Sequence, residues 1–464
     1  MSETFLKKLN GKTIALVGIG TSNLPLIGLF KKYGATVIAC DSKTESELGE
    51  NAAKAKSAGA VLNLGKDYLQ NLQCDIILRT PGMRYYSDEL NNFRAKGIVV
   101  TSEMELFFDL CPCKIIAVTG SDGKTTTTTI ISEFLKKAGY TVHLGGNIGT
   151  PLLPIIESIN PEDFAVVELS SFQLISMRQS PDIAVVTNLS PNHLDIHKDM
   201  QEYTDSKKNI FLHQNAFGKT VLNLDDDITS EFAKEARGNV LYFSRKQNVN
   251  NGTFLKDDTI YFADNGTITP VIKTADIKIP GWHNTENYMA AICAVWGLVT
   301  PQVIAQVAKE FAGVEHRAEF VAEVDGVKYY NDSIASSPTR TASGTLSLYK
   351  QKIILIAGGY DKKISYKLLG PVICNKVKTL IIMGNTAPKI KEATLTADNY
   401  SPDNPKIMEV SNMEEAVLAA RQNAIEGDIV SLSPASASFD LYKNFDARGK
   451  HFKQLVLELK ENNK

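Results

Sequence analysis

One short segment combines glycines, a lysine and hydroxyl side chains in a pattern that could hold the phosphates of a nucleotide. It consists of Gly120, Ser121, Asp122, Gly123, Lys124, Thr125 and Thr126. In a glycine-rich turn that leads into a helix, free backbone N–H groups and the positive end of the helix dipole bind phosphate oxygens. Lys124 can reach the β- and γ-phosphates, and the Thr125 hydroxyl can bind Mg²⁺. We therefore expect this segment to bind a nucleoside triphosphate.

The flanking residues predict the strand and the helix that such a loop requires. The apolar run 114–119 predicts a buried strand, and residues 127–135 predict the first turns of a helix. Val118 stands where the common phosphate-loop pattern has a glycine. An ordinary glycine turn between a strand and a helix therefore remains the alternative.

A carboxylate and a polar cluster follow the next apolar runs. Glu168 ends the predicted strand 164–168, and residues 188–195 follow the predicted strand 183–187. Ligands bind at the carboxyl ends of strands in parallel sheets, and Mg²⁺ beside a phosphate loop is commonly held by such a carboxylate. We expect Glu168 to be a metal ligand; a surface acid is the alternative.

Two histidines, His193 and His197, are four residues apart. A zinc site needs a third ligand, and Pro191 indicates a loop instead of the helix that this spacing requires. Taken alone, each histidine is expected to be a hydrogen-bonded structural residue.

The N-terminal segment carries an incomplete dinucleotide-binding pattern. Gly18 and Gly20 follow a predicted strand at 13–18, and Asp41 ends the next strand, but Asn23 occupies the third glycine position. This βαβ unit predicts a pyrophosphate site, with a nicotinamide nucleotide or another nucleotide as its ligand.

Composition excludes several classes of protein. The 464 residues contain 43% hydrophobic and 22% charged residues, and 50 Lys and Arg balance 52 Asp and Glu. We expect no nucleic-acid partner, and no apolar stretch is long enough for a membrane span. The six cysteines include one close pair, Cys111 and Cys113, with no second pair to complete a zinc site; free thiols in a cytoplasmic protein are expected.

Strands that alternate with helices predict an α/β protein of three domains. We place a Rossmann-like domain at 1–102, a central domain at 103–313 and a second Rossmann-like domain at 314–464. The central domain is predicted to have a P-loop ATPase-like parallel sheet with a small antiparallel patch at 240–280, where Asn251-Gly252 and Asn265-Gly266 break the β-runs.

In the last domain, polar clusters again follow predicted strands. They are Asn331-Asp332-Ser333, residues 358–362 and residues 433–438. Turn chemistry could explain any one of them, but together they indicate a third ligand-binding face.

Read in order, these motifs resemble the Mur ligase family of peptidoglycan synthesis over essentially the whole chain. The segments that carry the resemblance are 119–126, Gly145 to Gly149, 168–173, 188–195, Gly281 to Asn287, His316-Arg317, 331–333 and 433–449. The combination is specific, although no single segment is.

The resemblance implies a role for each matched residue. For ATP, it implies the loop residues above with Asn284, Asn287, Arg317 and Asp332. For two Mg²⁺ ions, it implies Thr125, Glu168, His193 and Lys207. For the UDP-muramoyl substrate, it implies Gly20, Asp41, Ser42, Thr80, Asn147, Ser170 and Gln173. For D-glutamate, it implies Ser336, Lys362, Ser438 and Phe445.

Lys207 falls where the family has a lysine carbamylated by CO₂, which turns a cation into an oxygen ligand for Mg²⁺. That reaction requires a partly desolvated, neutral amine. From the sequence alone, a solvated helix lysine is the favoured interpretation.

The implied reaction joins D-glutamate to UDP-N-acetylmuramoyl-L-alanine by ATP-driven amide formation through an acyl phosphate, catalysed by a monomer. Alternatives are a superfamily ligase with another amino acid or a folate substrate, a nicotinamide oxidoreductase and a non-catalytic nucleotide-dependent regulator. Two departures bear on this expectation: Ile334 replaces a lysine found in many relatives, and Asn23 replaces a glycine.

Overall fold

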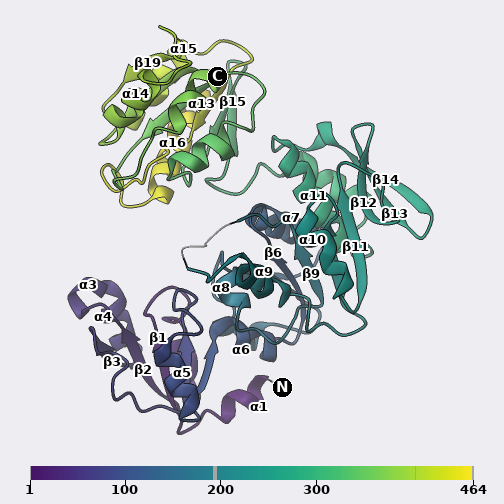
Figure 1. The fold of residues 1–464 in the computed structure, drawn as a ribbon, viewed down its shortest axis with the longest axis vertical. Coiled ribbons are helices and arrows are strands. Elements are labelled where there is room, and N and C mark those ends of the chain that lie inside the picture. Colours follow the sequence, from purple (N-terminus) through teal and green to yellow (C-terminus); the bar gives the residue numbers. More distant parts are fainter. Residues whose placement is uncertain (1, 192–195, 403, 462–464) are drawn as a thin grey trace. The chain divides into compact units, whose positions relative to one another are not determined.

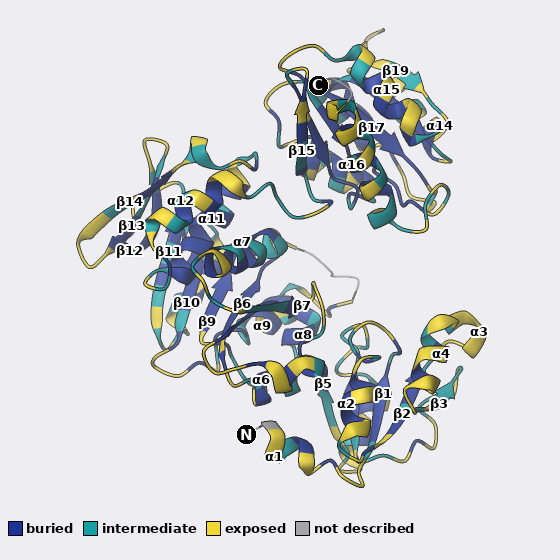
Figure 2. Ribbon diagram, turned by 180° about the vertical axis from the view of Figure 1, so that it is seen from behind, coloured by how far each residue is buried: buried dark blue, intermediate teal, exposed yellow. Residues whose placement is uncertain are grey.

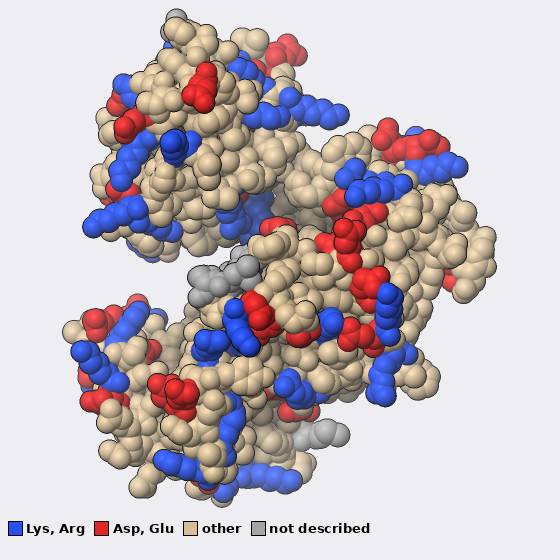
Figure 3. All heavy atoms as spheres, viewed as in Figure 1, with Lys and Arg blue, Asp and Glu red and all other residues tan. Residues whose placement is uncertain are grey.

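The computed structural model describes residues 2–191, 196–402 and 404–461, and the chain contains three β-sheets in succession (Figure 1). It forms two compact units, one of residues 1–274 with 286–307 and the other of residues 275–285 with 308–464. No helix among the described residues is both long and apolar enough to cross a membrane. Lysine, arginine and acidic side chains are interspersed on the face of each unit shown in Figure 3.

The first sheet is parallel throughout, with strand order β3-β2-β1-β4-β5. Its strands are β1 (Thr13–Val17), β2 (Thr36–Asp41), β3 (Val61–Leu64), β4 (Ile76–Arg79) and β5 (Val99–Ser102). The helices that connect or precede them are α1 (Ser2–Lys7), α2 (Leu26–Lys32), α3 (Glu45–Leu48), α4 (Glu50–Ser57) and α5 (Asp88–Ala95). Strands that are buried on both faces have continuous apolar sequences. The parallel sheet with helices between its strands confirms the prediction of a Rossmann-like first domain.

The second sheet is mixed, with strand order β14-β13-β12-β11-β10-β9-β6-β8-β7. Its strands are β6 (Lys114–Thr119), β7 (Val142–Gly146), β8 (Phe164–Glu168), β9 (Ile183–Val186), β10 (Lys219–Asn223), β11 (Asn239–Ser244), β12 (Asn251–Lys256), β13 (Thr259–Asp264) and β14 (Thr267–Lys273). Its helices are α6 (Glu103–Leu110), α7 (Lys124–Lys137), α8 (Ser171–Leu174), α9 (Met200–Lys208), α10 (Asp227–Glu231), α11 (Trp282–Val295) and α12 (Pro301–Glu310), with short 3₁₀ helices at Leu153–Ser158, Phe232–Lys234 and Thr274–Asp276.

The predicted antiparallel patch is formed by β12, β13 and β14. Asn265-Gly266 makes the second turn with positive φ at both residues, as expected for a tight hairpin. Asn251-Gly252 is not a turn, and that part of the prediction is wrong. The pair opens β12, and glycine is needed there because a side chain on Gly252 would overlap the backbone of Tyr242 on β11. The first hairpin turns at Asp257-Asp258 instead.

The third sheet has strand order β15-β16-β20-β17-β18-β19, parallel except for the edge strand β15. Its strands are β15 (Glu319–Val324), β16 (Val327–Asn331), β17 (Ile353–Gly358), β18 (Val377–Met383), β19 (Lys406–Glu409) and β20 (Ile429–Leu432). Its helices are α13 (Leu369–Lys376), α14 (Ala387–Leu395), α15 (Met413–Asn423), α16 (Phe445–Glu461) and the π-helix η4 (Arg340–Thr345). Buried hydrophobic clusters lie on both faces of this sheet. Figure 2 colours most of its central strands as buried.

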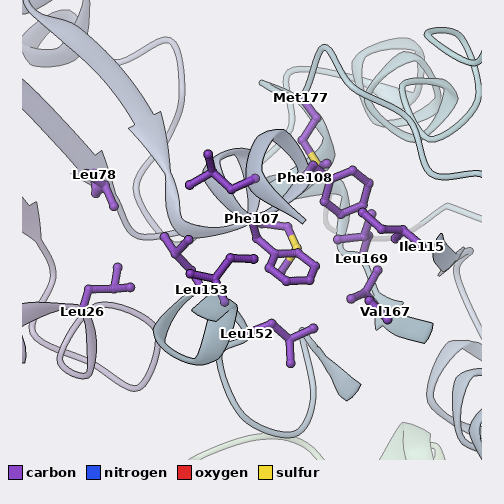
Figure 4. Packing of buried hydrophobic residues seen from close by; sticks show 14 of the residues in the cluster. Leu26, Leu78, Phe107, Phe108, Ile115, Leu152, Leu153, Val167, Leu169 and Met177 are labelled. Carbon is purple, nitrogen blue, oxygen red and sulfur yellow. The ribbon is translucent and has the colours of Figure 1, made fainter. Parts of the chain in front are cut away.

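Helix α6 joins the first two sheets through a shared apolar core. Phe107 and Phe108 from α6 belong to one buried cluster with Leu78 of β4 and Val167 of β8 (Figure 4). Leu152 and Leu153 join the same cluster. The side chains at the carboxyl ends of β4 and β8 are therefore held by one continuous core.

Candidate functional site

The phosphate loop is a tight turn between β6 and α7 that only glycine can make at two positions. Gly120 and Gly123 have φ of 149° and 77°, which L side chains rarely adopt. A Cβ on Gly120 would overlap Thr187 Oγ1, and one on Gly123 would overlap Asn287 Oδ1. The loop thus needs both glycines for its conformation and for the close approach of these two neighbours.

The loop after β9 holds the phosphate loop in place. Ser121 N donates to Asn188 O at 2.9 Å, and Asp122 N donates to the Asn188 side-chain oxygen at 2.9 Å. The Ser121 hydroxyl donates to Ser190 O and accepts from Ser190 N, both at 2.9 Å. Asn188 and Ser190, in the polar cluster predicted after β9, therefore hold the phosphate loop in position. His193 and Asp195, from the same cluster, lie outside the described residues.

Thr125 and Glu168 lie together at the edge where β6 and β8 end. The Thr125 hydroxyl donates to Glu168 Oε2 at 2.7 Å, and Asn147 Nδ2 donates to Glu168 Oε1 at 2.8 Å. Glu168 is buried, and β6 pairs with β8 through Val118 and Glu168. A hydroxyl and a carboxylate are oxygen ligands of the kind Mg²⁺ prefers, so the side chains present fit this ion.

The side chain of Lys124 folds back over the residues that precede it in the phosphate loop. Its Nζ donates to the backbone oxygens of Gly120 at 3.0 Å and Ser121 at 2.9 Å. The ammonium group is thus placed directly at the turn where phosphate oxygens are expected to bind.

Lys207 is not the solvated helix lysine favoured by the sequence alone. It is 1% exposed, and its Nζ donates to Gly120 O at 2.9 Å and Thr119 Oγ1 at 3.2 Å. Burial, reinforced by the charge of Lys124, lowers the pKa of Lys207 well below its usual value. Helix α9 therefore presents this amine to the underside of the phosphate loop in a form that loses its proton readily.

His197 has the structural role that the sequence predicts. Its Nε2 shares a hydrogen bond with Ser171 Oγ at 2.8 Å and its Nδ1 shares one with Glu202 at 3.2 Å. Its ring stacks on Phe172 with a centroid distance of 5.0 Å. Both ring nitrogens are engaged, so His197 fixes the segment after β8 to α9.

Ser170 and Gln173 cap helix α8. Ser170 N donates to Gln173 Oε1 at 3.0 Å, and Gln173 N donates back to the Ser170 hydroxyl at 3.3 Å. Arg79, which no predicted motif includes, is 1% exposed and donates to Phe172 O at 2.9 Å and Ser176 Oγ at 2.8 Å. The end of β4 in the first sheet is thereby tied to the segment that carries Ser170 and Gln173.

The first-sheet residues meet around the loop after β1. Asp41 accepts from Ile19 N at 2.9 Å and from Lys43 N at 3.0 Å. Asn23 is buried and donates to Val17 O at 2.9 Å, so this side chain closes the loop where the pattern has a glycine. Thr80 at the end of β4 lies against Gly18. Gly20 and Ser42 are exposed at the same loop and at the end of β2.

In the second unit, the predicted residues occur at the carboxyl ends of β16, β17 and β20. Asp332 is buried, accepts from Ala318 N at 3.2 Å and from the Thr345 hydroxyl, and has a pKa raised by burial. The other predicted residues at this sheet edge or near it are Arg317, Ser336, Lys362, Ser438 and Phe445. Lys362 and Phe445 are exposed and Ser438 is buried.

Arg448, for which the sequence motifs predict no role, organises this edge. It is 1% exposed, and its guanidinium donates to Ser333 O at 2.9 Å, Ser436 O at 3.1 Å and Ala437 O at 3.1 Å. It lies inside the segment 433–449 that carries the family resemblance, which is the signal that could have identified it.

Asn284 donates to Pro280 O at 2.6 Å within the turn that starts α11.

Comparison with known proteins extends over the whole chain. Residues 118–295 match the Mur ligase middle domain, and residues 316–436 match the Mur ligase glutamate ligase domain. The UDP-N-acetylmuramoylalanine–D-glutamate ligase of Acetivibrio thermocellus is 54% identical over 456 residues, which cover 97% of each chain. The protein of the same name from Clostridium beijerinckii is 50% identical over 456 residues and 98% of each chain.

Solved structures show the same three-sheet fold at low identity. MurF from Acinetobacter baumannii aligns with a TM-score of 0.59 at 16% identity, covering 99% of this chain and 98% of its own. The UDP-N-acetylmuramate-alanine ligase MurC from Thermotoga maritima aligns with a TM-score of 0.57 at 16% identity, covering 96% and 99%. With relatives at half identity over nearly full length and two matching domains, the chain belongs to the Mur ligase family.

Proposed function

We propose that this protein joins D-glutamate to UDP-N-acetylmuramoyl-L-alanine with ATP, in the synthesis of peptidoglycan precursors. The observation that carries the proposal is the edge shared by β6 and β8, where the phosphate loop, Lys124, Thr125 and Glu168 lie together. Relatives of about half identity over nearly full length bear the name of this ligase, which supports D-glutamate as the amino acid.

The reaction must first make a carboxylate electrophilic. The L-alanyl carboxylate takes the γ-phosphoryl group of ATP to give an acyl phosphate and ADP; the amine of D-glutamate then attacks that carbonyl, and phosphate leaves. Lys124 and the loop N–H groups offset the repulsion between the two anions that meet in the first step. Bound Mg²⁺, held by Thr125 and Glu168, would supply further positive charge at the transferred phosphoryl group.

We further propose that Lys207 reacts with CO₂ to form a carbamate. The neutral amine adds to CO₂ and releases one proton, which exchanges a cation for an anionic oxygen ligand. The buried position and the lowered pKa of Lys207 support this chemistry, because only the neutral amine is nucleophilic. Incubation with ¹³C-labelled bicarbonate should give a carbamate carbon signal that Lys207→Arg lacks; the same signal in both proteins would contradict the assignment.

We propose that each of the three predicted domains contributes residues that bind a particular substrate. Residues 1–102 would bind the UDP end through Gly20, Asp41 and Ser42. Residues 103–313 would bind ATP and the muramoyl peptide. Residues 314–464 would bind D-glutamate and also carry Arg317 and Asp332, which are expected to contact ATP. The muramoyl peptide would contact Thr80 of the first domain and Asn147, Ser170 and Gln173 of the central domain. All six cysteines carry free thiols, which supports a cytoplasmic location.

The test is ADP release by the purified wild-type protein, with each UDP-muramoyl precursor paired with each candidate amino acid. The proposal expects release only with UDP-N-acetylmuramoyl-L-alanine and D-glutamate together, with an amide product of matching mass. Release that depends on L-alanine, a diamino acid or a folate would assign the protein to another ligase of the superfamily and overturn the proposal.

A further inference from the structure

A short π-helix, η4 (Arg340–Thr345), is anchored at the carboxyl edge of the third sheet. The hydroxyls of Thr341 and Thr345 share hydrogen bonds with Ser433 Oγ at 3.0 and 2.7 Å, and Thr345 also donates to Asp332. Thr341, Thr345 and Ser433 are almost completely buried. Segments of π-helix occur frequently at functional sites, and this one is fixed to the ends of both β16 and β20.

Arg340, the first residue of η4, is a partly buried cation whose guanidinium has no partner among the residues that the structure describes. Its backbone N donates to Ser337 Oγ at 3.4 Å, but its guanidinium makes no hydrogen bond or ion pair with any residue that the structure describes. In the same unit, Arg448 makes hydrogen bonds to Ser333, Ser436 and Ala437, and Arg421 pairs with Asp325. Because Arg340 is partly exposed, its guanidinium is accessible to an anion supplied from outside, and a charge-assisted hydrogen bond to such an anion is among the stronger polar interactions.

The neighbourhood of Arg340 is the edge at which an amino acid would bind. Its positive charge acts on Asp332, where it opposes the rise in pKa that burial causes. The strand order β16-β20-β17 brings the loops that carry Ser336, Ser438 and Lys362 to this same edge. Ile334, in the loop between β16 and η4, contributes no charge.

We propose that Arg340 binds a carboxylate of the acidic amino acid substrate. This inference rests on the proposed function. A dicarboxylate carries two negative charges when its amine is neutral and able to attack, and Lys362 can pair with only one of them. Arginine presents a planar fork that bonds both oxygens of a carboxylate, and its charge does not depend on pH in the working range.

The experiment compares steady-state kinetics of the wild type, Arg340→Gln and Arg340→Lys, with each of the three substrates varied in turn. Loss of a charge-assisted bidentate pair is expected to raise KM for D-glutamate by about tenfold or more in Arg340→Gln. KM for ATP and for the UDP-muramoyl substrate should stay within about twofold of the wild type. Arg340→Lys keeps the charge without the fork and should fall between the two.

The matched control is Arg421→Gln, since Arg421 pairs with Asp325 in the turn between β15 and β16, at the opposite end of β16. It should leave all three KM values unchanged. A double variant tests for recovery. Ile334→Lys in the Arg340→Gln background restores a cation to the same loop and should recover part of the affinity for D-glutamate.

An unchanged KM for D-glutamate in Arg340→Gln would overturn the proposal, and so would a rise in KM for ATP alone, which would make the bound anion a nucleotide phosphate. If Arg340→Gln does not fold, Arg340→Lys decides: an unchanged KM for D-glutamate refutes the role of the fork. Failure of the proposed function is distinct, because the wild type itself would then show no ADP release that depends on D-glutamate.

Discussion

Glu103, the first residue of α6, offers a test of how burial controls a charge in this fold. It is 6% exposed, and its Oε1 accepts hydrogen bonds from Leu152 N at 3.1 Å and Leu153 N at 3.0 Å. These N–H groups stabilise the carboxylate, but burial is the larger effect and raises the pKa of Glu103 from 4.5 to about 7. The structure thus predicts a neutral carboxylic acid at this position in the folded protein at mildly acidic pH.

The consequence for stability has a definite sign. Below the unfolded-state pKa near 4.5 both states bind the proton and Glu103 costs nothing. As the pH rises from there to about 7, the unfolded state loses its proton first, so stability falls. A tenfold change in a proton equilibrium is worth about 1.4 kcal/mol, so the total loss approaches about 3 kcal/mol above the folded-state pKa.

Glu103→Gln should remove this loss, because an amide cannot ionise and its Oε1 can accept the same two N–H groups. Urea unfolding at about pH 5 should give similar free energies for the variant and the wild type, whereas at about pH 8.5 the variant should be more stable by up to about 3 kcal/mol. Glu133→Gln, which alters an exposed acid on α7, is the control and should show no such pH dependence.

An effect of Glu103→Gln on stability that does not change with pH would refute the reasoning. If Glu103→Gln destabilises the protein equally at both pH values, the carboxylate is charged in the folded state and its bonds to the N–H groups outweigh burial. The difference between the two pH values, and not the absolute stability, is therefore the quantity that decides.

Other predictions concern the phosphate loop. Lys124→Ala should reduce ADP release by at least about 100-fold, because the loop loses its cation at the transferred phosphoryl group; a variant that releases ADP at the wild-type rate would show that the loop is wrongly assigned. Gly123→Ala forces a side chain into the left-handed region at φ 77° and against Asn287, at a cost of at least about 1 kcal/mol, and should weaken ATP binding in a calorimetric titration. Gly139→Ala, at a positive φ of 95° with nothing within 4 Å of the added Cβ, is its control for backbone strain alone.

Local patterns were enough to predict the elements that position the site. The phosphate loop, the strand that ends at Glu168 and the alternation of strands and helices are encoded within short segments, since apolar runs and glycine turns act over a few residues. The sequence predicted Thr125 and Glu168 as separate ligands of one metal site, because parallel strands end at the same edge of a sheet. The hydrogen bond between the two side chains is a finding of the structure.

The properties of individual side chains depended on contacts distant in sequence. Lys207 is buried against the phosphate loop, which lies more than eighty residues away in the sequence. The pKa of Glu103 depends on burial against a segment about fifty residues away. The burial of Arg79 and Arg448 could not be predicted, because a buried arginine and an exposed one look alike in a sequence; only the family-like segment 433–449 pointed to the region of Arg448.

The sequence by itself determined the order of strands, helices and glycine turns, and through its likeness to the Mur ligases it indicated the chemistry. Only the tertiary structure decided which charged groups are withdrawn from water, as with Lys207 and Glu103, and which cations lack a partner among the described residues, as with Arg340. The physical reason is that burial and electrostatic pairing are properties of packed neighbours, and those neighbours come from distant parts of the chain.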